Sequence, residues 1–286
     1  MTIRNPISLL LLMSMFLSQE VFAQEKSALA GNAALRYWAA FSELQDSGIT
    51  ADQVRELNLI LGGTAPYRDD AYKDLLERNA PALNVMARGT KLRNCDWGLD
   101  YALGSDTPVE YVRKALELGR LNVLYAFHLS LAGDKQGTAH TLAAGMRFSR
   151  DVANGSSLFG TLAASDLLVT HFHAIEGLSH LQEISSAQTS ELRAAISQLG
   201  PSGLDWQAAV DREFDVLERP EWRESLREIR QNYAAALKNP SKLTVLQQSI
   251  ANAPPDLRKL IANPERVLEE KQDLANQLQL VRQALR

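Results

Sequence analysis

The sequence predicts an all-α protein, and three observations support this prediction. Apolar residues recur at spacings of three and four, as in the series Leu29, Ala33, Tyr37, Phe41 and Leu44. Alternating apolar and polar residues, which indicate strands, are nearly absent. Glycine, proline and capping residues divide the chain into helix-sized segments. We expect about ten helices paired as hairpins, in either a compact bundle or an irregular α-solenoid.

The first helices are predicted from capping and stop signals. Thr50 and Gln53 have the spacing of a capping box, and the helix that they open is expected to stop at Gly62-Gly63. Pro66 and Pro81 are interpreted as the first turns of two further helices, the second of which ends at Gly89. The helical pattern lapses between residues 90 and 106, where we expect a loop.

Three long helices are predicted next, over residues 108–132, 135–153 and 157–183. Thr107 is the expected cap of the first of them, with Pro108 in its first turn and Glu110 completing the box. Another helix is predicted to begin at Ser186 or Thr189 and to end before Gly200. Prolines punctuate the remainder of the chain, at positions 220, 240, 254, 255 and 264.

The segment 264–286 is predicted to be a terminal amphipathic helix. Its apolar residues have heptad-like spacing and form one stripe, the seam, in which Lys271 occupies the one polar position. The apolar positions are Val267, Leu274, Leu278, Val281 and Leu285. We expect this helix to dock on its own protein. The alternative is a helix that binds a partner or a second copy.

The N-terminal residues 1–23 have the features of a cleaved signal peptide. Arg4 supplies a positive charge, residues 7–17 form a short apolar core, and Val21-Phe22-Ala23 resembles a cleavage site. The apolar run is shorter than the roughly 20 residues that span a bilayer. We therefore expect no membrane span, and an exported chain of one helical domain, residues 24–286, in the periplasm or the medium.

The overall composition excludes some classes of function. A net charge of −4, with 22% charged and 45% hydrophobic residues, is typical of an ordinary soluble domain. No basic footprint indicates nucleic-acid binding. Cys95 is the one cysteine, so no intrachain disulfide can form, and we expect the thiol to be buried.

All five histidines lie between His128 and His180, which makes this window the natural place to look for metal ligands. His173, Glu176 and His180 have spacings that put three side chains on one helix face, where they could hold zinc or iron. His128 or His140 could add a ligand from a neighbouring helix. The spacing matches no established zinc motif, so structural histidines are the favoured interpretation, and no metal or cofactor is expected.

Other catalytic signatures are missing from the sequence, and no catalytic residue is identified. There is no nucleophile elbow, phosphate-binding glycine loop or His-Glu-x-x-His. Asp96 and Asp100 flank Trp97, an arrangement that can line a sugar site. The favoured interpretation is that Trp97 packs the loop onto the core.

Two segments resemble a known group of proteins. Asn32-Ala-Ala-Leu-Arg-Tyr-Trp-Ala-Ala-Phe41 and Asn94-Cys-Asp-Trp-Gly-Leu-Asp-Tyr101, followed by Gly133-Asp134, are similar to parts of uncharacterised secreted helical proteins from environmental bacteria. The resemblance implies an all-helical exported protein. Because that group has no assigned activity, it transfers no functional residue.

These observations favour a non-enzymatic binding or assembly protein of the cell envelope. Such a protein would hold a partner in a groove between helix hairpins or through the terminal helix 264–286. The alternative is a metal-dependent hydrolase centred on His173, Glu176 and His180.

Overall fold

The structure is a computed structural model that describes residues 31–45, 49–107, 109–180 and 186–286. All regular secondary structure in these residues is helical, apart from isolated bridges between Asn32 and Asn94 and between Gly200 and Gly203. The all-α prediction is therefore confirmed. The predicted signal peptide, residues 1–23, lies outside the described residues.

The α-helices follow many of the boundaries that the sequence punctuation suggests. They are α2 (Ala33–Glu43), α3 (Ala51–Leu61), α4 (Asp69–Gly89), α5 (Glu110–Leu131), α6 (Lys135–Ala153), α7 (Leu158–His180), α8 (Ser186–Ser197), α9 (Trp206–Val216), α10 (Arg223–Lys238), α11 (Leu243–Asn252), α12 (Pro255–Leu260) and α13 (Pro264–Ala284). Short 3-10 helices cover Tyr101–Asp106, Pro220–Trp222 and Pro240–Lys242.

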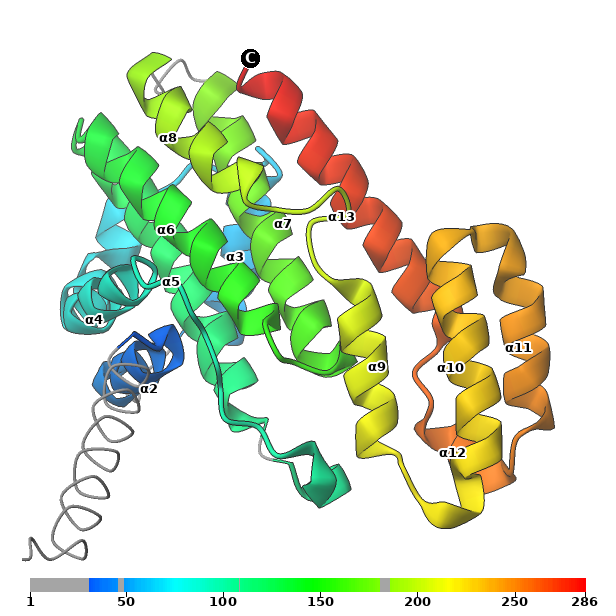
Figure 1. Ribbon diagram of the computed structural model, residues 1–286. Coiled ribbons are helices and arrows are strands. Elements are labelled where there is room, and N and C mark those ends of the chain that lie inside the picture. Colours follow the sequence, from blue (N-terminus) through cyan, green and yellow to red (C-terminus); the bar gives the residue numbers. More distant parts are fainter. Residues whose placement is uncertain (1–30, 46–48, 108, 181–185) are drawn as a thin grey trace, which may run out of the picture.

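The centre of the molecule is formed by α5, α6 and α7, which pack side by side (Figure 1). Helices α2 and α4 lie on one side of this centre, α8 packs on α6, and α9 to α12 lie toward the other side. Helix α13 packs against α7, although five helices intervene in the sequence. A solenoid repeat contacts only its neighbours in sequence, so this arrangement is a bundle and not a solenoid.

Several predicted helix boundaries are confirmed. Thr50 and Gln53 form the expected capping box of α3, with Thr50 Oγ1 accepting from the Gln53 amide at 3.2 Å. The Gly133-Asp134 turn separates α5 from α6, and the Asp134 carboxylate caps α6 by accepting from the Gly137 amide at 2.8 Å. These local signals are reliable because each satisfies backbone groups that a helix end leaves free.

The predictions that Pro66 and Pro81 lie in the first turns of helices are both wrong, because Pro66 precedes α4 and Pro81 lies inside it. Helix α4 begins at Asp69 and continues through Pro81 to Gly89. Proline lacks an N–H, so the Glu77 carbonyl one turn earlier loses its usual helical donor. The buried face of α4, which includes Tyr72, Leu76 and Leu83, keeps the helix in place despite this loss.

The prediction that Thr107 caps the following helix is also wrong. The Thr107 hydroxyl donates to the carbonyls of Gly104 and Asp100, at 2.8 and 3.0 Å, and so closes the preceding 3-10 turn. Helix α5 begins at Glu110 without a side-chain cap. A threonine hydroxyl can serve either turn, and the sequence pattern does not distinguish them.

The apolar seam of α13 faces the protein itself. The seam residues that the spacing singled out are all at most 3% exposed: Val267, Leu274, Leu278, Val281 and Leu285. They belong to one continuous cluster of buried side chains that extends back to α2. The interpretation of segment 264–286 as a self-docking helix is thus confirmed, and its apolar face is occupied.

One helix in the described part of the chain is long and apolar enough to cross a membrane. It is residues 158–178 of α7, and 61% of that window is buried inside the protein. The same length and apolarity are found in the core helix of a bundle, where neighbouring helices cover it on several sides.

Candidate functional site

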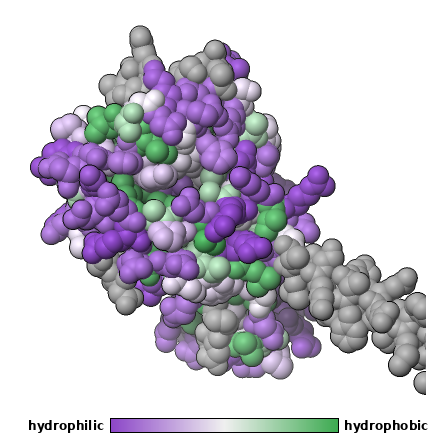
Figure 2. Space-filling model, turned by 90° about the vertical axis from the view of Figure 1, so that its left-hand side faces the viewer, coloured by the Kyte–Doolittle hydropathy of each residue, from purple (hydrophilic) through white to green (hydrophobic). Residues whose placement is uncertain are grey.

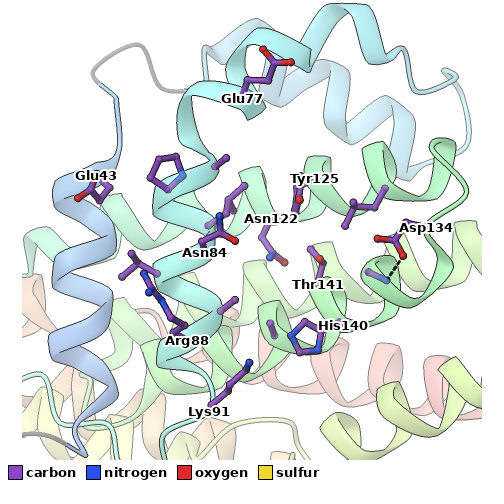
Figure 3. A pocket seen from close by; sticks show the side chains of 18 residues that line it. Glu43, Glu77, Asn84, Arg88, Lys91, Asn122, Tyr125, Asp134, His140 and Thr141 are labelled. Carbon is purple, nitrogen blue, oxygen red and sulfur yellow. Dashed lines mark hydrogen bonds between the residues drawn. The ribbon is translucent and has the colours of Figure 1, made fainter.

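A groove of about 1020 Å³ lies between α4, α5 and α6 (Figure 3). Helix α5 forms its floor, α4 and α6 form its walls, and Glu43 at the end of α2 reaches one edge. The surface on the side of α2 and α4 is mostly hydrophilic, with apolar side chains showing in patches among the polar ones (Figure 2). The volume lies at the upper end of the range typical of small-molecule sites.

One wall of the groove exists because α4 continues through its proline. Glu77, Pro81, Asn84 and Arg88 are spaced by four, three and four residues, which places them on one face of a continuous helix. Lys91 follows one turn later at the end of this stripe. The sequence-based prediction missed this stripe because it split the helix at Pro81.

The floor of the groove carries a buried amide, the side chain of Asn122. Asn122 is 3% exposed, and the atom placed as its Oδ1 lies 3.0 Å from Nε2 of His171 on α7. His171 is fully buried, and its Nδ1 donates to the Leu167 carbonyl at 2.6 Å. Gly145 makes room for this pair, because a Cβ there would overlap both the imidazole and the amide.

The protonation of His171 fixes the orientation of the Asn122 amide. Burial lowers the pKa of His171 to about 4, so the ring is neutral near pH 7. Since Nδ1 uses the one ring proton to reach the Leu167 carbonyl, Nε2 can only accept. We therefore assign the Asn122 amide in the flipped orientation, with its NH₂ toward His171 and its carbonyl oxygen directed away from the ring.

The charged groups of the α4 stripe are separated along its length, while Glu43 and Asp134 reach the groove from α2 and from the turn before α6. Arg88, Lys91 and His140 lie toward one end, and Glu77 lies at the opposite end (Figure 3). Among the described residues, Arg88 and Lys91 form no ion pair, and Glu77 has one long contact of 4.0 Å with Lys73. These charges are therefore available to a ligand.

His140 is held at the edge of the groove by a partner on another helix. Its Nδ1 lies 2.9 Å from Oε1 of Glu191 on α8, and Gln136 donates to the second oxygen of that carboxylate at 3.1 Å. A carboxylate partner fixes the ring orientation. His140 is consequently committed to this pair instead of adding a metal ligand through Nδ1.

His128 and His173 lie in separate environments. His128 Nδ1 is 2.5 Å from the Asp69 carboxylate, whereas His173 lines an apolar pocket of about 680 Å³ together with Tyr67, Phe127 and Leu178. No three metal-binding side chains come together among those that the structure describes. The side chain of His180 is outside that set, so the site of His173, Glu176 and His180 stays a prediction.

The loop around Trp97 is structural. Trp97 is 6% exposed and stacks on Tyr111 with a centroid separation of 4.3 Å, while its Nε1 donates to the Asp151 carbonyl at 2.8 Å. Asp96 and Asp100 accept from backbone amides two residues ahead, which closes turns. The interpretation that Trp97 packs the loop onto the core is confirmed.

Cys95 is buried in the same region, as expected. Its thiol is free and lies 3.5 Å from the Asp151 carbonyl. Burial, followed by the charges of Asp151 and Asp96, raises the pKa of Cys95 well above its usual value. The thiol is therefore held in its unreactive protonated form.

Comparison with known proteins adds no assignment. No family model matches the chain, and neither the curated proteins nor the solved structures include a significant match. The groove must therefore be interpreted from its own chemistry.

Proposed function

We propose that this chain is an exported, non-enzymatic binding protein of the cell envelope, and that the groove between α4, α5 and α6 is its ligand site. The observation that carries the proposal is the Asn122 amide at the floor of the groove. Its orientation depends on His171 from α7 and on the absence of a side chain at Gly145. A buried polar group with a fixed direction is typical of a site that selects ligands.

The composition of the walls also supports binding. Apolar side chains such as Leu83, Val85 and Leu129 offer contact area, while Thr141 adds a nearly buried hydroxyl beside the amide. Ligand sites combine such apolar area with a few polar groups that set orientation. Because the seam of α13 is occupied within the chain, the groove is the better of the two partner surfaces expected from the sequence.

Retention of compounds by the mature chain tests this function. Residues 24–286 would be incubated with the small-molecule fraction of an envelope extract, washed by dialysis, denatured and analysed by mass spectrometry. Asn84→Trp fills the groove from the exposed face of α4. Asn276→Trp is a matched control, because it places the same side chain in a separate cleft between α7 and α13.

The retained compounds show whether the groove is the ligand site. We expect compounds that the unmodified chain and Asn276→Trp retain and that Asn84→Trp releases. If nothing is retained, or if both variants retain the same compounds, the groove is not the ligand site. Circular dichroism would confirm that both variants are folded before they are compared.

A further inference from the structure

The positions of charge along the groove point to a class of ligand, and this step rests on the function proposed above. Glu77 and Arg88 lie on the same face of α4, about three helical turns or ~16 Å apart. Arg88 and Lys91 make one end cationic, and Glu77 makes the other end acidic (Figure 3). A ligand that complements both ends has an anionic group and a cationic group separated by a comparable distance.

The acidic end has a second acceptor. Because Pro81 has no N–H, the Glu77 backbone carbonyl lacks its helical donor, and it lies on the helix turn that carries the Glu77 carboxylate. Oxygen acceptors suit an ammonium group, which has three donors and no acceptor. The guanidinium of Arg88 at the far end suits a carboxylate, which it can bind through two parallel hydrogen bonds.

The middle of the groove suits a backbone amide. Asn122 presents its side-chain amide at the floor, and the Thr141 hydroxyl lies nearby on α6. An extended chain advances roughly 3.3–3.6 Å per residue, so about five residues span ~16 Å. From these features we infer that the groove binds a short peptide with free termini, its ammonium at Glu77, its carboxylate at Arg88 and Lys91, and a central amide at Asn122.

Titration calorimetry with alanine peptides tests the inference on the mature chain. The probes are penta-alanine with free termini, the same peptide with an amidated C-terminus, the N-acetylated form, and di-alanine. We expect penta-alanine to bind, and each terminal modification to weaken binding about tenfold, because each removes one charge-assisted contact. Di-alanine should bind more weakly than penta-alanine, because it reaches one end only.

A comparison of one variant with the free and amidated peptides tests which residue binds the peptide carboxylate. Arg88→Gln should weaken penta-alanine about tenfold and should reduce the difference between the free and amidated peptides, of which Lys91 keeps the remainder. Arg258→Gln is the matched control, since Arg258 is exposed on α12, away from the groove residues. Its affinities should equal those of the unmodified chain.

The results distinguish this inference from the proposed function. If penta-alanine does not bind, or binds equally well after amidation and acetylation, the peptide assignment is overturned. Groove-dependent retention of compounds, tested with Asn84→Trp, would then still support a ligand site with another class of ligand. If Asn84→Trp releases nothing and penta-alanine binds regardless of Arg88, both proposals fail.

Discussion

The Tyr37 hydroxyl on α2 donates a 2.6 Å hydrogen bond to the Asp151 carboxylate on α6, 114 residues away in the sequence. Both side chains are nearly inaccessible to solvent, and the second carboxylate oxygen accepts from Arg150 at 2.8 Å. Burial raises the pKa of Asp151, while Arg150 and Tyr37 oppose this effect. The hydrogen bond between Tyr37 and Asp151 ties α2 to the centre of the bundle.

Replacement of Tyr37 by phenylalanine should destabilise the protein. The change leaves a buried carboxylate oxygen without its donor, so we expect the free energy of unfolding to fall by about 1–3 kcal/mol. Urea unfolding followed by circular dichroism would measure the difference. Tyr125→Phe is the control, because among the described residues the Tyr125 hydroxyl makes no hydrogen bond, and its loss should cost less than about 0.5 kcal/mol. Equal effects of the two changes would contradict the role of the pair.

The burial of His171 should make stability fall on acidification. Its pKa is about 4 in the folded chain, against roughly 6.5 in an unfolded one, so between these values only the unfolded state takes up the proton. Stability should therefore rise with pH through this window, by up to about 3 kcal/mol. Asp151 acts in the opposite direction, because its raised pKa makes its contribution decrease as the pH rises.

Comparison with a variant isolates the histidine component. His171→Gln has no titrating ring, and unfolding of both chains would be measured from pH 4 to 7. The unmodified chain should gain more stability over this range than the variant does. Parallel curves for the two chains would show that folding does not lower the pKa of His171.

The glycine at position 145 should not tolerate even a methyl group. A Cβ there would overlap the His171 ring and the Asn122 amide, both of which are fixed by packing. We expect Gly145→Ala to lower the free energy of unfolding by about 1–3 kcal/mol. Gly177→Ala is the matched control in α7, where no atom lies within 4 Å of the added carbon. It should raise stability by up to about 1 kcal/mol, since alanine favours the helix. A loss of stability in both variants would point to a general intolerance of helical glycine replacement.

The docking of α13 should depend on its seam. Leu278 is fully buried against the bundle, and Leu280, two residues later, is 50% exposed. Leu278→Ala should cost about 2–5 kcal/mol through lost contacts and a cavity, whereas Leu280→Ala should cost about 0.5 kcal/mol or less. Thermal unfolding of the two variants would decide the matter. A large effect at Leu280 would reveal that its exposed side chain has a partner in solution.

The sequence determined the helical class, most helix boundaries and the buried seam of α13, because these follow from local rules. Thr50 and Gln53 cap α3 through groups one turn apart, and Leu274 and Leu278 share a face through the helical repeat. The burial of Cys95 and Trp97 followed from residue type. Each of these features depends on residues close together in the chain or on the preference of one side chain for the interior.

Only the tertiary structure decided where the candidate site lies. The continuation of α4 through Pro81 is stabilised by a buried face against other helices, which no local signal at Pro81 reports. The amide at the groove floor is positioned by His171 on a different helix and by the space above Gly145. Long-range packing brings these residues together, and it places His128, His140 and His171 beside different partners for the same reason.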